Sequence, residues 1–248
     1  SSSITVDSVS TSLGSLGLDV DDDSTVSSLT VGHTTPVSIA SGKTLSGAIT
    51  VTAGSIKLGE VGTLGATVSM SGGTLDADET LTVSGALTQS GAITIDVAED
   101  KTLTYSAGAG IGIGANTLTL SGGGTLSNTF EIVLDNSNSK LLLNSITLRS
   151  FITSADSLGI DVNADSSVTV LEIRNITPVS IASGKTLSGA IYVTAGSIKL
   201  GEAGTLASTV SMSGGTLDVD ETLTLSGALS QGGAITIDVA EDKTLTYS

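Results

Sequence analysis

The sequence predicts an all-β fold, a parallel β-solenoid (β-helix) of about 14 rungs of roughly 18 residues. Three observations predict it: a long internal repeat, a shorter period inside that repeat, and strict alternation of apolar and polar residues between the turns. A single rung of such a coil cannot bury its apolar side chains alone, whereas stacked rungs bury them in a continuous column. We therefore expect the repeats to stack on one another.

The long repeat has an offset of about 142 residues. Residues 35–106 return at 177–248 with 64 of 72 positions identical. The flanking residues 3–34 match 145–176 at roughly 15 of 32 positions. The chain therefore divides into the end of a preceding unit (1–34), one full superrepeat (35–176) and the start of a second, incomplete superrepeat (177–248), all in one solenoid. Because both ends fall inside a repeat, we expect the chain to be a window of a longer one.

Each rung follows one plan in chain order. A short strand such as Val37-Ser38-Ile39 comes first, and a polar turn that closes with Thr44-Leu45 follows. A second strand comes next, and a glycine such as Gly54 turns the chain back. On this plan, rungs begin at Pro36, Ser55, Thr74, Ala92, Ala109, Gly124, Lys140 and Leu158.

The strands are predicted from residues that alternate between apolar and polar, as in Ile93-Thr94-Ile95-Asp96-Val97. This period of two indicates strands with one buried and one solvated face. A helix is excluded, because no apolar stripe recurs at 3.6 residues and β-branched residues dominate. Short strands also build sandwiches and barrels, but their strands do not repeat in sequence as these do. The residues expected to face inward include Leu45, Leu64, Leu81, Leu103 and Leu118, together with Val51, Met70, Val83, Tyr105 and Leu120.

The composition excludes several classes of protein. The 248 residues contain no cysteine, which excludes a disulfide framework and a cysteine metal site. The net charge of −16 opposes binding to nucleic acid, and no apolar stretch is long enough for a membrane helix. The expected partners are adjacent repeats of the same chain or identical neighbouring chains, and perhaps-adhesive contacts with a cell surface or matrix. We expect no nucleic acid partner and no membrane insertion.

Two segments carry a resemblance to a known class of repeats: Gly114-Ala-Asn-Thr-Leu-Thr-Leu-Ser-Gly-Gly-Gly-Thr-Leu126 and the stretch from Gly73 to Ile95. They resemble the Ser/Thr/Gly-rich β-solenoid repeats of large bacterial surface proteins, such as autotransporter passengers and filamentous-haemagglutinin-like adhesins. The resemblance covers the whole chain. It implies an extracellular or cell-surface location and a structural or adhesive role, such as the shaft of a giant adhesin, fibre or filament.

Acidic turns are the candidate metal sites. Carboxylates at alternate positions near a turn can gather on one side and bind Ca²⁺ through oxygen ligands. The best candidate for calcium is the run Asp19, Asp21, Asp22 and Asp23. The alternative is that these carboxylates are solvated turns that keep a β-rich surface soluble. No other cofactor is expected.

Serine and threonine pairs on the outward side of the strands are a second candidate for binding. Pairs such as Thr50 and Thr52 would place two hydroxyls on one face, and stacked rungs would turn them into a flat array. Such an array is able to bind ice, a glycan or another surface. It is imperfect, because Tyr192 takes the place of Thr50 in the second superrepeat. The other pairs expected in this column are Thr82 with Ser84, Thr104 with Ser106 and Thr119 with Ser121.

Catalysis is not expected, and no catalytic residue is assigned. Polysaccharide-cleaving β-helices need clustered acid and base groups, often with Arg or Lys, and aromatic platforms for the sugar. This chain has one histidine, His33, two arginines, Arg149 and Arg174, and no tryptophan. The position equivalent to His33 in the second superrepeat is Asn175. A structural role is therefore the main expectation, and a ligand- or ion-binding solenoid is the alternative.

Overall fold

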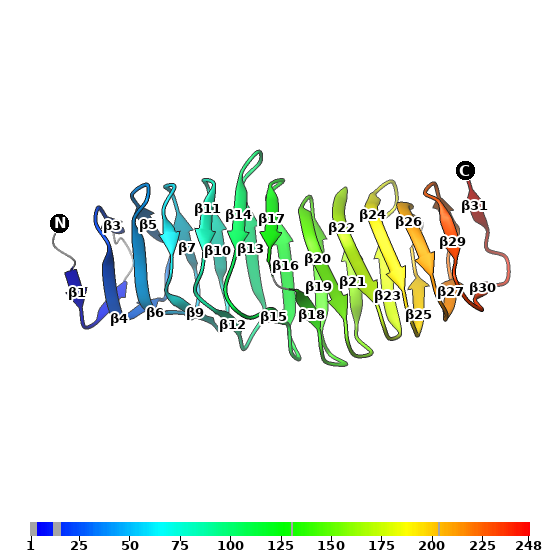
Figure 1. The fold of residues 1–248 in the computed structure, drawn as a ribbon, viewed down its shortest axis with the longest axis horizontal. Helices are drawn as coiled ribbons and strands as arrows, with labels where there is room; N and C mark the ends of the chain where they lie inside the picture. The colour runs from blue at the N-terminus through cyan, green and yellow to red at the C-terminus, as the bar shows by residue number, and fades with distance from the viewer. Residues whose placement is uncertain (1–3, 12–15, 130, 203) are drawn as a thin grey trace. The chain divides into compact units, whose positions relative to one another are not determined.

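A computed structural model describes residues 4–11, 16–129, 131–202 and 204–248. These described residues form strands and turns and contain no helix (Figure 1). The strand pairs are parallel throughout the described ladders, as in β5 (Thr35–Ile39) beside β7 (Ser55–Leu58). The predicted parallel β-solenoid is therefore confirmed.

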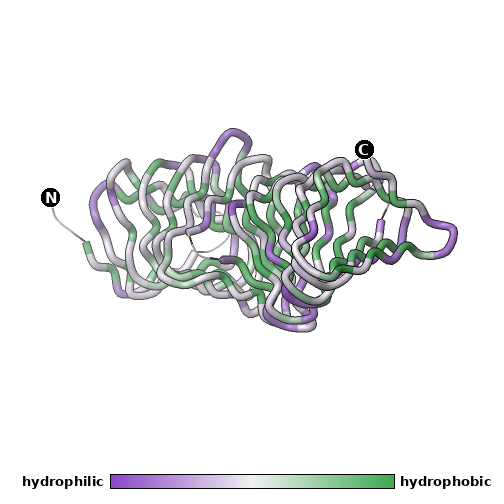
Figure 2. Tube along the Cα trace, turned by 45° about the vertical axis from the view of Figure 1, so that its right-hand side comes forward, coloured by the Kyte–Doolittle hydropathy of each residue, from purple (hydrophilic) through white to green (hydrophobic). Residues whose placement is uncertain are grey.

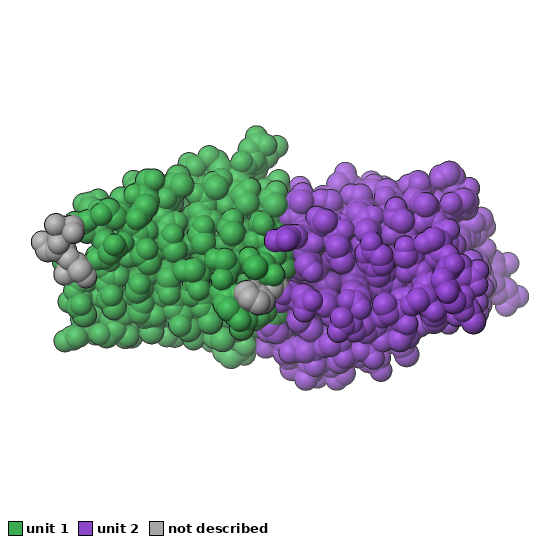
Figure 3. All heavy atoms as spheres, viewed as in Figure 1, with its two compact units in different colours: residues 1–111, 118–130 green, residues 112–117, 131–248 purple. Residues whose placement is uncertain are grey.

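The chain divides into two compact units: unit 1 comprises residues 1–111 and 118–130, and unit 2 comprises 112–117 and 131–248 (Figure 3). Each turn supplies one strand to a first sheet, sheet 1, and one or two strands to a second, sheet 2. In unit 1, sheet 1 contains β3 (Leu18–Val20), β5, β7, β10 (Thr74–Ala77), β13 (Ile93–Val97) and, from Leu118 onward, β16 (Thr117–Ser121). Sheet 2 of unit 1 contains β1 (Ile4–Val6), β2 (Val9–Thr11), β4 (Ser24–Val31), β6 (Thr44–Val51), β8 (Thr63–Leu64), β9 (Thr67–Met70), β11 (Leu81–Val83), β12 (Leu87–Gln89), β14 (Thr102–Tyr105) and β17 (Thr125–Asn128).

Unit 2 repeats this arrangement. Its strands of sheet 1 are β19 (Lys140–Asn144), β21 (Gly159–Val162), β23 (Thr177–Ile181), β25 (Ser197–Leu200), β27 (Thr216–Val219) and β30 (Thr236–Val239). Its strands of sheet 2 are β18 (Ile132–Leu134), β20 (Thr147–Thr153), β22 (Ser166–Ile173), β24 (Thr186–Val193), β26 (Thr205–Met212), β28 (Leu223–Leu225), β29 (Leu229–Gln231) and β31 (Leu245–Tyr247). The short strand β15 (Ile111–Gly112) also belongs to sheet 2.

The turns are longer and fewer than the sequence predicts. Sheet 1 has 12 strands, so the solenoid has about 12 turns in place of about 14. The shortest step between paired residues is 19, as from Ser55 to Thr74, and the longest is 25, from Ile93 to Leu118. The expected rung starts at Ala109 and Gly124 are wrong. Thr117–Ser121 is the first strand of a turn and not the second, because it pairs with β13 in sheet 1.

The alternation of residues produces the core as expected. Along β13, Ile93, Ile95 and Val97 are buried, while Thr94 and Asp96 are partly exposed. All ten residues that were expected to face inward are buried. They do not form one ladder, since Leu64 pairs with Val83, and Leu81 pairs with Leu103. In Figure 2 the hydrophilic residues gather in the turns that join the strands.

Glycine permits a sharp bend in the two long strands β6 and β24. The pairing of β6 with β4 changes register between Val26 and Leu29, and Gly47 lies opposite that break with φ of 114°. A Cβ atom at Gly47 would overlap the carbonyl oxygen of Val26. Gly189 occupies the same place in β24, with φ of 128°. Only glycine combines this backbone angle with such a close approach between turns.

Candidate functional site

The acidic run expected to bind calcium makes contacts with the next turn. Lys43 Nζ lies 2.6 Å from Asp22 Oδ1, and this hydrogen bond raises the pKa of Lys43 above its ordinary value. The backbone N–H of Thr44 donates to Asp23 Oδ1 over 2.9 Å. Asp19 lies in β3 opposite Ser38, and both Asp19 and Asp21 are exposed. Two of the four carboxylates therefore tie adjacent turns together.

The second superrepeat keeps part of this arrangement. The backbone N–H of Thr186 donates to Asp165 Oδ1 over 2.8 Å, as Thr44 does to Asp23. Ala164 stands at the position of Asp22, so Lys185 has no equivalent of that carboxylate in the sequence. The described residues contain no group of three or more His, Cys, Asp or Glu side chains placed to hold a metal ion. Calcium at Asp19, Asp21, Asp22 and Asp23 stays a prediction.

Lysines bridge the other acidic turns in the same way in both superrepeats. Lys57 Nζ lies 3.3 Å from Asp76 and 2.7 Å from Asp78 on the following turn. Lys101 Nζ lies 2.6 Å from Glu79 on the preceding turn. The second superrepeat reproduces these pairs as Lys199 with Asp218 and Asp220, and Lys243 with Glu221. The pairs are partly exposed, so each contributes at most about 1 kcal/mol.

The burial of Asp76 distinguishes it from its neighbours. Desolvation raises the pKa of the Asp76 carboxyl, and the hydrogen bond from Lys57 opposes that rise. The pKa of Lys57 is itself raised, chiefly by its hydrogen bond to Asp78. The ammonium group of Lys57 thus compensates two carboxylates that share one edge of sheet 1, and this is a stabilising role within the stack.

Stacked hydroxyls form a continuous surface in unit 1. In sheet 2, Thr50 pairs with Ser69, and Ser69 pairs with Thr88. The Oγ1 of Thr88 donates to the Oγ of Ser69 over 3.2 Å. Two residues further along each strand, the ladder continues through the backbone N–H groups of Thr52, Ser71 and Ser90. We call the exposed residues Thr50, Thr52, Ser69, Ser71, Thr88 and Ser90 the hydroxyl face.

The expected single column of Thr/Ser pairs is wrong in its membership. Thr82 pairs with Thr63 and Thr104, which forms a second row on sheet 2. Thr119 pairs with Thr94 and lies in sheet 1. The sequence plan merged these rows, because it treated every strand after a Thr-Leu pair as the same strand of the rung.

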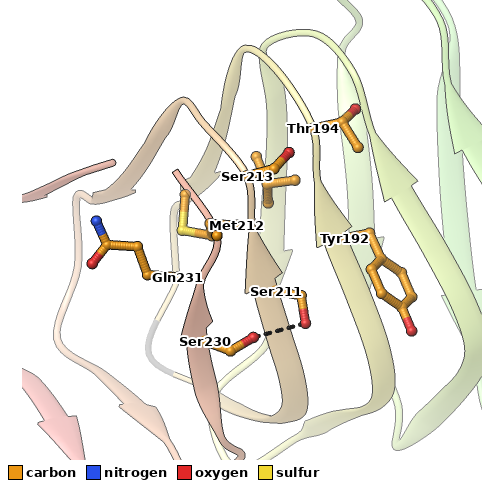
Figure 4. A pocket seen from close by; sticks show the side chains of 9 residues that line it. Tyr192, Thr194, Ser211, Met212, Ser213, Ser230 and Gln231 are labelled. Carbon is orange, nitrogen blue, oxygen red and sulfur yellow. Dashed lines mark hydrogen bonds between the residues drawn. The ribbon is translucent and has the colours of Figure 1, made fainter. Parts of the chain in front are cut away.

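In unit 2 the equivalent surface is hollowed into a groove with a volume of about 240 Å³ (Figure 4). Tyr192 pairs with Ser211, and Ser211 pairs with Ser230, so three adjacent turns supply its walls. The Oγ of Ser230 donates to the Oγ of Ser211 over 2.9 Å. The remaining lining residues are Val193, Thr194, Met212, Ser213, Gln231 and Gly232.

The turn beside the groove carries an ion pair. Glu172 pairs directly with Tyr192, and the guanidinium of Arg174 donates to both Glu172 oxygens over 2.8 and 2.9 Å. This contact lowers the pKa of Glu172. The carboxylate and the guanidinium therefore compensate one another next to a groove whose nine lining residues carry no charge.

Sequence reasoning missed two features of this surface. The lysine bridges join residues 19 to 22 positions apart, and that spacing was the available signal. The groove was signalled by Tyr192, which was interpreted only as a flaw in the hydroxyl array. His33 lies exposed in the turn between β4 and β5, where its carbonyl accepts from Thr35.

Comparison with known proteins adds no name to this geometry, since no protein family, curated protein or solved structure matches the chain. Within the described part of the chain, no helix has the length and apolar character needed to cross a bilayer.

Proposed function

We propose that the chain is a structural segment of an extracellular β-solenoid, the shaft of a giant adhesin, a fibre or a cell-surface filament, without catalytic activity. The observation that carries this proposal is the repeated stacking of turns. Val51 and Met70 are buried in one superrepeat, and Val193 and Met212 are buried in the same way in the other. The lysine bridges recur between the same turns. Such repetition favours a role that is spread along the molecule.

The last turn of unit 2 supports adjacent repeats as partners, whether of the same chain or of an identical neighbour. Ile95, Val97 and Tyr105 are at most 2% exposed, because β16 and β17 cover them. Their equivalents Ile237, Val239 and Tyr247 are 46%, 38% and 63% exposed. An apolar face and an unpaired strand edge of this kind favour pairing with another parallel strand. Contacts with a cell surface or matrix belong to the same proposal.

The parent gene and the cell surface test the shaft. The proposal expects a reading frame with tens of such units between a secretion signal and an anchoring or adhesive domain. It also expects antibodies against residues 35–106 to label intact cells. A reading frame of 248 codons, or labelling only after the cells are permeabilised, would contradict it.

The hydroxyl face supports a second candidate, a solenoid that binds a surface. The six hydroxyls of this face lie in two rows on adjacent turns, which are spaced by about 4.8 Å in a sheet. For ice binding, a thermal hysteresis that disappears in a Thr50→Lys variant would support this role, and an unchanged freezing curve would remove it. For calcium, a melting temperature that is the same in calcium and in chelator would remove the site at Asp19–Asp23.

A further inference from the structure

The two superrepeats differ most at the groove. Residues 35–106 and 177–248 differ at eight of 72 positions, and the groove contributes nine of those positions. Three of the eight differences fall on the nine groove residues, and five fall on the other 63. The three are Tyr192 in place of Thr50, Ser230 in place of Thr88, and Gly232 in place of Ser90. Change is thus concentrated on one small surface of an otherwise duplicated fold.

These three exchanges reshape the surface in one direction. Tyr192 adds an aromatic ring on the first of the three turns. Ser230 lacks a methyl group that threonine has, and Gly232 lacks a side chain, so the third turn recedes. The groove of about 240 Å³ is smaller than the roughly 300–1,000 Å³ of pockets that hold drug-sized ligands. It suits one ring of a ligand that continues along the surface.

The lining selects a neutral, polar ligand with an apolar face. Tyr192 is 44% exposed, so its ring offers apolar area together with a polar tip. Hydroxyls of Ser211, Ser213 and Ser230 lie along the neighbouring strands (Figure 4). The lining residues carry no charge, and the net charge of −16 repels polyanions.

We propose that the Tyr192 groove binds one ring of a neutral saccharide. The ring of Tyr192 stacks on the apolar C–H face of the sugar, and the hydroxyls of Ser211 and Ser230 form hydrogen bonds with the hydroxyls of the sugar. Ser230 donates to Ser211, so Ser211 keeps its own O–H proton for the ligand. This site does not depend on the proposed shaft role, because it rests on the groove alone.

The duplicated chain supplies matched variants for the test. The variant Tyr192→Thr/Ser230→Thr/Gly232→Ser gives the second superrepeat the surface of the first. A side chain fits at Gly232, where a Cβ would meet its nearest atoms at 3.8 and 3.9 Å. The reverse variant, Thr50→Tyr/Thr88→Ser/Ser90→Gly, gives the first superrepeat the surface of the second. The melting temperature of each variant checks that the fold is kept.

The probes are maltohexaose, cellohexaose and chitohexaose, each titrated to about 10 mM and followed by saturation-transfer NMR and calorimetry. We expect at least one of them to bind the unmodified chain at one site. Removing the Tyr192 surface should weaken that binding about tenfold or more, as loss of an aromatic anchor does. The reverse variant should bind two equivalents.

Three results would overturn the proposal. The first is that no probe binds the folded chain. The second is binding that survives the Tyr192 triple variant, which would place the sugar elsewhere. The third is a dimer of the chain that is lost in the triple variant, which would assign the groove to a second copy of the protein. Each of these is distinguishable from failure of the shaft proposal, which concerns the parent gene and the cell surface.

Discussion

Ile95 and Ile237 are the same residue of the repeat in two different surroundings. Ile95 lies between Leu75 and Leu120 on the turns to either side and is 1% exposed. Ile237 pairs with Leu217 on one side and is 46% exposed. Replacing each with alanine therefore compares a turn that has two covering neighbours with a turn that has one.

The expected loss of stability follows from burial. Each substitution removes three carbon atoms, which are worth about 2.4 kcal/mol when fully buried at about 0.8 kcal/mol each. At Ile95 a cavity adds to this loss, so Ile95→Ala should cost about 3–4 kcal/mol. At Ile237 roughly half the transfer free energy is lost and no closed cavity forms, so the cost should be about 1 kcal/mol.

The measurement is the free energy of local opening from amide hydrogen exchange, supported by urea unfolding of both variants. Local opening is the appropriate quantity, because long repeat stacks do not always unfold in one step. The amides of β10 report on Ile95, and those of β27 report on Ile237. Equal losses in the two variants would refute the claim that the next turn buries the interior of each turn.

Three further predictions concern the bend, the lysine bridges and the one buried tyrosine hydroxyl that pairs with a turn. Gly47→Ala should lower the melting temperature by many degrees because of the overlap with Val26, whereas Gly108→Ala, with no atom within 4 Å of its Cβ, should change it little; similar effects would contradict the close approach. The raised pKa values of Lys57 and Lys199 give stability that is complete below 10.5 and is lost as pH rises through the raised values, so a Lys57→Met/Lys199→Met variant should lose less stability than the unmodified chain between about pH 9 and 12; parallel curves would refute this. Tyr105→Phe should cost about 1–3 kcal/mol in unfolding free energy, because the Tyr105 hydroxyl accepts from the N–H of Leu87 over 3.1 Å, whereas Tyr247→Phe should cost almost nothing; an equal cost would contradict this role.

The core was predictable from the sequence because one-sided burial leaves a period of two. Ile93, Ile95 and Val97 could be assigned to the interior without knowing which strand they pair with. The phase of the turns was harder to predict. Thr117-Leu118 begins a strand of sheet 1, whereas Thr102-Leu103 begins a strand of sheet 2. The same dipeptide occurs in both, so only the neighbouring turn decides its sheet.

The surface features depend on register, which the sequence states only weakly. Lys57 reaches Asp76 because the step between their turns is 19 residues, while another step in the same sheet is 25. The hydroxyl rows were merged for the same reason. Tyr192 was visible as an exception, but its groove depends on Ser230 and Gly232 from a turn about 40 residues further along, a distance set by two steps of about 20 residues each.

Cross-linking of adjacent turns tests the central claim most directly, since the chain has no cysteine of its own. Ser69 and Thr88 are paired residues of neighbouring parallel strands. Their separation of about 4.8 Å falls within the range of Cα distances that a disulfide spans. The double variant Ser69→Cys/Thr88→Cys should therefore form an intramolecular disulfide rapidly on mild oxidation, and Ser211→Cys/Ser230→Cys should do the same. If both pairs stay reduced in the folded chain, the turns do not stack in parallel at this register.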